Sequence, residues 1–205
     1  MNKFALAFFL LAPVPSALAA ATGASTGVAP SGVYVTDPAH TSLTWKISHF
    51  GLSNFTARFT GIEVRLDWNA ETPEASTLKV SVDPLSVRTD FPYPEFEDFD
   101  AKIGGSEDFF AAQPIAFEAR SIKVTGEGNA TVEGDLTFRG ATHPARLEVH
   151  FNGSVAEHPM DKKPRLGFSA TGTVHRTDWG LGFAVPALGE DVDLLIEAEF
   201  VPPQS

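Results

Sequence analysis

The sequence predicts an all-β protein, an antiparallel up-and-down barrel of about eight strands with a short helix over one end. Two observations predict the strands. Apolar side chains recur at every second position over most of the chain, and short Gly-containing turns separate these runs. A third observation predicts the helix, because one stretch instead places its apolar side chains at helical spacing.

The first twenty residues have the features of a secretory signal peptide. Lys3 precedes an apolar run over residues 4–12, and the small residues that signal peptidase recognises follow at 17–19. This run is too short to anchor the chain in a bilayer. Residues 21–32 are small, polar and rich in Gly and Pro, which indicates a flexible leader. We therefore expect a periplasmic protein with a signal peptide over 1–20, a leader over 21–32 and one barrel domain over 33–203.

The composition argues against several classes of protein. The chain has no cysteine, so neither disulfides nor thiolate zinc sites can contribute to its stability. It carries 15 basic and 26 acidic residues, a net charge of −11, which repels phosphate backbones and anionic lipid headgroups. No apolar run after the signal peptide is long enough to cross a membrane. We expect neither a nucleic-acid partner nor stable membrane insertion.

The clearest strand pattern runs from Thr41 to His49, where Leu43, Trp45, Ile47 and His49 alternate with polar residues. The same alternation continues to the end of the chain. Its later apolar positions are Phe55/Ala57/Phe59, Ile62/Val64/Leu66/Trp68, Leu78/Val80/Val82, Leu85/Val87, Ile115/Phe117/Ala119, Val132/Gly134/Leu136/Phe138, Ala145/Leu147/Val149/Phe151, Leu166/Phe168/Ala170/Val174 and Val192/Leu194/Ile196/Ala198/Phe200.

The alternation changes phase at two points, at Thr60-Gly61 and at Asp83-Pro84. A one-residue slip would turn every later side chain to the wrong face, so a β-bulge at each point is the simplest explanation. Bulges of this kind are common in strongly curved strands, which favours a barrel over a flat sheet.

Residues 91–110 predict a short amphipathic helix. Phe96, Phe99 and Ile103 lie at helical spacing among acidic residues, and Gly104-Gly105 ends the pattern. Such a helix would lie over one end of the barrel as a lid. It is either a gate, in which Phe99, Phe109 and Phe110 move to admit a ligand, or a plain cap that seals the core.

Five segments, in order from Tyr34 to Phe200, resemble motifs of the YceI family. They are Tyr34-x-x-Asp37-x-x-His40-Thr41; Ile47-Ser48-His49-Phe50-Gly51; Ser106-Glu107-Asp108-Phe109-Phe110 with Gln113-Pro114-Ile115-Ala116-Phe117; Gly134-Asp135-Leu136-Thr137-Phe138-Arg139-Gly140-Ala141-Thr142-His143-Pro144; and Gly167-Phe168-Ser169-Ala170 with Arg176-Thr177-Asp178-Trp179-Gly180. The chain departs from the family pattern at Ala57 and Val64, where glycine is usual. Larger side chains there would narrow the interior or shift a bulge.

The resemblance implies a lipocalin-like β-barrel with a long apolar tunnel, which in some family members holds polyprenyl chains, including quinone-like or phosphate-bearing isoprenoids. It implies that this chain is a non-catalytic periplasmic carrier of a polyisoprenoid or isoprenoid quinone, without a cofactor or metal. An eight-stranded barrel is just wide enough to enclose one slender ligand or to be filled by its own side chains. Each buried CH₂ group contributes about 0.8 kcal/mol, so an isoprenoid tail needs no hydrogen bond to bind.

The candidate ligand-binding residues are inward-facing strand residues, lid aromatics and one aromatic near the last turn. They are Leu43, Trp45, Ile47, His49, Phe55, Phe59, Phe99, Phe109, Phe110, Phe117, Leu147, Val149, Phe168, Trp179, Leu194 and Ile196. We expect Arg176 to Gly180 to form a salt-bridged tight turn in which Trp179 plugs the barrel.

Two other functions are compatible with the sequence. His40, His49 and His175 could serve an enzyme or a metal site, since imidazole is both a ligand and a proton carrier, but no tight ligand spacing is present. His49 alone could contact a polar headgroup. A barrel filled by its own side chains would instead suit an interaction module, in a stress response or in transient contact with a membrane or redox protein.

Overall fold

The computed structural model describes residues 28–204, so the predicted signal peptide and residues 21–27 of the predicted leader lie outside the described residues. The described part contains ten strand segments, three 3₁₀ turns and one α-helix. They are β1 (Gly32–His49), β2 (Ser53–Phe59), β3 (Ile62–Trp68), η1 (Pro73–Ala75), β4 (Thr77–Val82), η2 (Pro84–Ser86), β5 (Val87–Arg88), α1 (Phe99–Gly105), β6 (Ile115–Gly126), β7 (Asn129–Phe138), β8 (Ala141–Val155), β9 (Arg165–His175), η3 (Arg176–Trp179) and β10 (Leu188–Val201).

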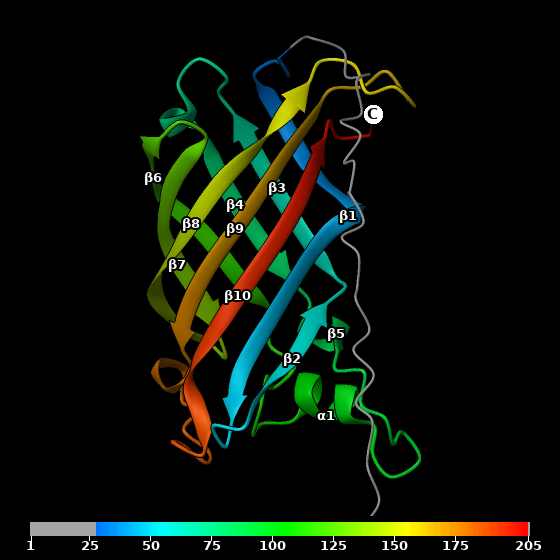
Figure 1. The fold of residues 1–205 in the computed structure, drawn as a ribbon, viewed down its shortest axis with the longest axis vertical. Coiled ribbons are helices and arrows are strands. Elements are labelled where there is room, and N and C mark those ends of the chain that lie inside the picture. The colour runs from blue at the N-terminus through cyan, green and yellow to red at the C-terminus, as the bar shows by residue number, and fades with distance from the viewer. Residues whose placement is uncertain (1–27, 205) are drawn as a thin grey trace, which may run out of the picture.

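The ten segments form a closed barrel of eight antiparallel strands, as the sequence predicted. β2 and β3 follow one another along β1 and act as one interrupted strand, and β4 and β5 do the same beside them. From β6 to β10 each strand pairs with the next, and β10 pairs with β1 to close the sheet. Figure 1 shows the barrel along its length, with α1 beside its lower end.

The two predicted phase changes are strand breaks rather than β-bulges. The Thr60 amide donates to the Ser86 carbonyl (3.1 Å) and the Asp83 amide donates to the Gly61 carbonyl (2.9 Å), so the two breaks lie side by side and kink the wall together. A Cβ atom at Gly61 would lie 2.9 Å from the Cβ of Ser86, which explains why glycine is needed there.

The helix is shorter than the sequence predicted and begins later. The Asp98 side chain caps it by accepting from the Ala101 amide (3.0 Å), and Ile103 is its main buried apolar residue. Phe96 precedes the helix and is 82% exposed, so its expected place on the buried face was wrong. Gly104 lies against the η2 turn, since a Cβ there would be 2.7 Å from the Pro84 carbonyl oxygen.

The end of the barrel opposite α1 is packed with side chains. Leu166, Tyr34 and Phe200 are almost fully buried there, and Trp68 stacks on Phe151 with 5.8 Å between ring centroids. We call this part the closed end. The rings of Trp68, Phe151, Phe168 and Phe200 meet in its interior.

The predicted leader does not extend to residue 32 as a flexible segment. Ala29 is buried at the closed end, and its amide donates to the Ser154 hydroxyl (3.1 Å). The Tyr34 hydroxyl donates to the Pro30 carbonyl (2.8 Å), which fixes the next residue as well. Residues 29–31 are therefore attached to the barrel domain, Ala29 by packing and the exposed Pro30 and Ser31 by hydrogen bonds.

Gly134 on β7 is a close-approach position, and its replacement by alanine should destabilise the fold. A Cβ there would lie 2.4 Å from the Glu118 carbonyl oxygen and 2.5 Å from the Phe117 ring. Because the backbone cannot move away within a paired ladder, we expect Gly134→Ala to lower the free energy of unfolding by about 1–3 kcal/mol. Gly182→Ala, where nothing lies within 4 Å, should change it little. Urea denaturation of both variants checks this, and equal losses would contradict it.

Candidate ligand-binding cavity

A cavity of about 560 Å³ occupies the half of the barrel nearer α1. Its wall is almost entirely apolar. It is formed by β1, β2, β4, β6, β7, β8, β9 and β10, by residues 91–110, which we call the lid, and by the segment after η3. The lining residues are Leu43, Trp45, Ile47, His49, Phe55, Phe59, Val80, Val82, Phe91, Phe99, Ile103, Asp108, Phe109, Phe110, Ile115, Phe117, Leu136, Phe138, Ala145, Arg146, Leu147, Val174, Arg176, Trp179, Leu181, Phe183, Leu188, Val192, Leu194 and Ile196.

Fourteen of the sixteen candidate residues line this cavity; Val149 and Phe168 do not. Phe168 packs at the closed end against Trp68, Phe151 and Phe200. Val149 lies two residues beyond Leu147, towards that same end. Both were predicted from the inward phase of their strands, but this phase does not say how far along the barrel a side chain lies.

The two departures from the family pattern both lie outside the cavity wall. Val64 is buried in the closed-end cluster, where its bulk adds to the packing. Ala57 pairs with Trp45 across the β1–β2 ladder and is buried beside it. Neither residue lines the cavity, so neither narrows it directly.

Several lining residues were missed as site residues. Leu136, Phe138, Val174 and Val192 carried the same alternation signal as the chosen positions. A second group, Leu181, Phe183 and Leu188, lies in or beside a loop with no periodicity, and nothing in the sequence pointed to it.

The lid closes the cavity from the side of α1 with an aromatic cluster. Phe110 contacts the rings of Trp45, Phe59 and Phe138, with centroids 5.4–6.1 Å apart. Arg139, in the β7–β8 turn, donates to the Glu107 carbonyl (2.7 Å) and to the Phe109 carbonyl. It also donates to the Trp179 carbonyl (3.1 Å), so one guanidinium ties the lid to η3.

Arg176 organises the loop on the other side of the cavity. Its guanidinium is buried and donates to the carbonyls of Gly189 (2.7 Å), Phe183 (2.8 Å), Leu188 (3.1 Å) and Leu181. Burial lowers the pKa of this guanidinium, while Glu190 opposes that effect. The predicted salt bridge within the turn was wrong, because no ion pair of Arg176 occurs in residues 28–204 and backbone carbonyls take its hydrogen bonds instead.

The predicted plug, Trp179, is buried at the cavity wall. Its indole N–H donates to the Ala141 carbonyl (3.1 Å), and its ring contacts Phe138 and His143. Gly180 ends η3 with a φ of 77°, a left-handed conformation that glycine adopts without strain. Arg176 to Trp179 thus form a turn that Gly180 ends, and Trp179 lies in the cavity wall.

The cavity reaches the surface between the β1–β2 turn and the loop that follows η3. His49 and Phe183 line it from these two sides, and both are exposed to solvent. The turn and the loop are joined by a hydrogen bond from the Phe50 amide to the Ala187 carbonyl (2.6 Å). We call this opening the mouth; a polar group of a bound molecule can reach water here while its apolar part stays inside.

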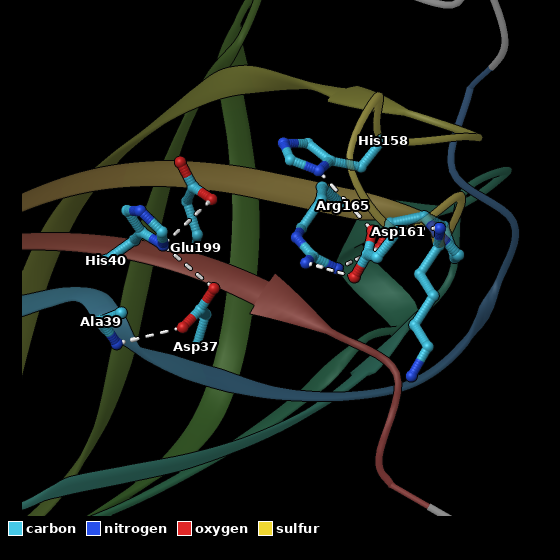
Figure 2. A network of polar contacts seen from close by, with 9 residues as sticks. Asp37, Ala39, His40, His158, Asp161, Arg165 and Glu199 are labelled. Carbon is cyan, nitrogen blue, oxygen red and sulfur yellow. Dashed lines mark hydrogen bonds and ion pairs between the residues drawn. The ribbon is translucent and has the colours of Figure 1, made fainter.

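The three histidines considered for catalysis or metal binding have separate surroundings. His40 lies in a bulge of β1 opposite Glu199, where its Nδ1 is 3.0 Å from an Asp37 oxygen and 3.9 Å from a Glu199 oxygen (Figure 2). His40 is exposed, Asp37 and Glu199 are half-buried, and the three are close enough together to share a divalent cation, but none of them lines the cavity. The hydrogen bond between Asp37 and His40 lowers the pKa of Asp37 and raises that of His40.

His175 should titrate above the ordinary histidine value of about 6.5. Its Nδ1 lies 2.6 Å from an Asp191 oxygen, and this hydrogen bond, with the charge of Asp191, raises the pKa of His175. The stabilisation by this pair is full below the unfolded-state pKa and is lost as pH rises through the higher folded-state pKa. NMR titration should show the midpoint falling in Asp191→Asn. An unchanged midpoint would contradict this assignment.

The geometry defines a class of protein. A closed antiparallel barrel of eight strands, packed at one end and hollow and apolar at the other, has a lipocalin-like fold. In residues 28–204 no helix is both long and apolar enough to span a membrane.

The chain belongs to the YceI family, because the YceI-like domain model matches residues 34–200. A UPF0312 protein of Pseudomonas fluorescens (strain SBW25) is 34% identical over 165 residues, which cover 79% of this chain and 81% of that protein. Among solved structures, a Campylobacter jejuni YCEI protein matches with a TM-score of 0.65 and 24% identity, over 78% of this chain and 91% of that one. A polyisoprenoid binding domain from Saccharophagus degradans matches with a TM-score of 0.55 and 13% identity, over 83% and 98%.

Proposed function

We propose that this protein binds one long apolar molecule, a polyisoprenoid or an isoprenoid quinone, and carries it in the periplasm. The observation that carries the proposal is the cavity of about 560 Å³ with an almost wholly apolar wall. Its volume lies in the range of about 300–1,000 Å³ that small-molecule sites occupy. The similar structure from Saccharophagus degradans is that of a polyisoprenoid binding domain, which supports the same ligand class.

The orientation of the ligand follows from the two ends of the barrel. The closed end is filled by rings such as Trp68 and Phe168, so the tail can occupy only the half nearer the lid. A polar headgroup would then lie at the mouth, where His49 lines the cavity and is exposed to solvent. Hydrocarbon needs only to be removed from water, and each buried CH₂ contributes about 0.8 kcal/mol.

Two features favour binding over the alternatives. An interaction module with a filled barrel would have no such cavity, whereas only the closed end of this barrel is packed. A histidine-dependent enzyme would bring its histidines together at the ligand, but of the three candidates only His49 lines the cavity, and His40 and His175 each pair with a carboxylate outside the cavity wall. We therefore propose a non-catalytic carrier.

The three tryptophans provide a direct test. Trp45 and Trp179 line the cavity and Trp68 lies at the closed end, so a bound quinone should quench the first two. We expect ubiquinone-2, which has two isoprene units, to quench the fluorescence of the wild-type protein saturably. Trp68→Phe should keep this quenching, and the double variant Trp45→Phe/Trp179→Phe should lose most of it. Equal quenching in the two variants, or none in the wild type, would refute the proposal.

A further inference from the structure

Large apolar side chains are exposed around the mouth of the cavity. Phe50 and Leu52 project from the β1–β2 turn, and Phe183 and Val185 from the loop after η3. Leu52 is 88% exposed and Phe183 70%, which is unusual for residues of this size when they lie together. We call these four residues the rim patch.

The rim patch is one surface and not two separate loops. The Phe50 amide donates to the Ala187 carbonyl (2.6 Å), and His49 pairs with Leu188 in the β1–β10 ladder. The ring of His49 lies against that of Phe50, with centroids 4.7 Å apart. Backbone hydrogen bonds therefore hold the two apolar segments next to each other at the end of the barrel that Figure 1 shows at the bottom.

The rim patch is also free of charge, in a chain whose net charge is −11. Residues 49–55 and 180–189 contain no Lys, Arg, Asp or Glu, and acidic residues begin only at Glu190. An uncharged apolar tip suits the interface of a zwitterionic bilayer, where aromatic rings are favourable and no counter-charge is needed. The acidic remainder of the surface is repelled by anionic headgroups.

The backbone at Phe50 is an independent indication that this side chain is needed. In the turn His49–Leu52, closed by a Leu52 N–H to His49 carbonyl bond (3.0 Å), the two central residues Phe50 and Gly51 have φ values of 53° and 67°. Asn-Gly is the preferred pair for such a turn, and a bulky residue with positive φ is strained. The turn thus carries an exposed aromatic residue at the expense of its own stability.

The cavity and the rim patch are continuous, because Phe183 belongs to both. We propose that the rim patch docks the mouth on the surface of a zwitterionic phospholipid bilayer, so that an apolar ligand passes between cavity and lipid without crossing water. The passage of ligand rests on the proposed function, whereas the docking does not. Contact of this kind is shallow and reversible, since only loop tips enter the interface.

Flotation with phosphatidylcholine vesicles tests the docking, with the chain that lacks the predicted signal peptide over 1–20. The test variant is Phe50→Asn/Leu52→Glu, which places the favoured Asn-Gly pair in the turn and removes two apolar side chains that do not line the cavity. Met160→Glu is the matched control, because Met160 is 87% exposed in the β8–β9 loop at the closed end. We expect the wild type and Met160→Glu to float with the vesicles. The partition coefficient of the double variant into the vesicles should be at least about tenfold lower.

The outcomes separate the two proposals. A double variant that loses vesicle binding yet remains quenched by ubiquinone-2 supports docking by the rim patch. Vesicle binding without ubiquinone-2 binding would refute the proposed function and leave the docking in place. Failure of the wild type to bind vesicles, or equal binding by the double variant, overturns the docking. The docking is also overturned if sedimentation shows that the wild type is a dimer and that the double variant is a monomer, since the patch would then join two copies of the chain.

Discussion

Replacement of Leu194 by tryptophan should abolish most of the binding of an isoprenoid ligand without unfolding the barrel. Leu194 lines the cavity from β10, opposite Trp45 on β1 and Gly172 on β9. An indole there would extend into empty space and exclude part of the tail. The loss of one isoprene unit of five carbons from the cavity costs about 4 kcal/mol, roughly a thousandfold in affinity.

The matched control for this variant is the next residue on the same strand. Leu195 is 50% exposed on the outer face of the barrel, so Leu195→Trp adds the same indole outside the cavity. Both variants add a tryptophan, so binding of ubiquinone-2 is followed by a signal from the ligand and not by protein fluorescence. The titration should show unchanged affinity for Leu195→Trp and a large loss of affinity for Leu194→Trp. Thermal unfolding of both variants should remain cooperative. An equal affinity in the two variants would mean that the ligand lies elsewhere.

Replacement of Arg176 by methionine should have the largest effect on stability. Methionine keeps much of the side-chain length, but the carbonyls of Leu181, Phe183, Leu188 and Gly189 lose their donor. Hydrogen bonds to a charged group contribute about 1.5–3 kcal/mol each, and the removal of a buried charge offsets part of that loss. We expect the free energy of unfolding to fall by about 3–5 kcal/mol, measured by urea denaturation.

Arg58 provides the comparison for Arg176. It forms an exposed ion pair with Asp90 (2.7 Å), and such pairs contribute less than about 1 kcal/mol. Arg58→Met should therefore be nearly neutral. If Arg176→Met were as mild as Arg58→Met, the guanidinium would not be what holds the loop at the mouth.

The wall of the barrel could be predicted because its physics is local. A strand with one face towards an apolar interior must alternate, so Trp45, Phe117 and Leu194 were identified from spacing alone. The phase changes at Gly61 and Pro84 were also visible, although they are strand breaks that pack on each other. The alternation identifies a change of face, but a bulge and a break both produce one.

The extent of the cavity along the barrel could not be predicted in the same way. Phe168 and Leu147 both point inward, yet Phe168 meets Trp68 and Phe151 at the closed end, whereas Leu147 faces the cavity. That difference depends on which rings from distant strands reach the same height. The role of Arg176 was missed for a similar reason, because its carbonyl partners lie in a loop with no periodic signal.

The binding of an isoprenoid in this cavity is tested most directly by native mass spectrometry of the protein purified gently from its own host. We predict one adduct per chain, with the mass of an isoprenoid lipid, that organic solvent removes and that Leu194→Trp greatly reduces. Detection of the bare polypeptide alone, or of an adduct that Leu194→Trp leaves at full occupancy, would contradict the account.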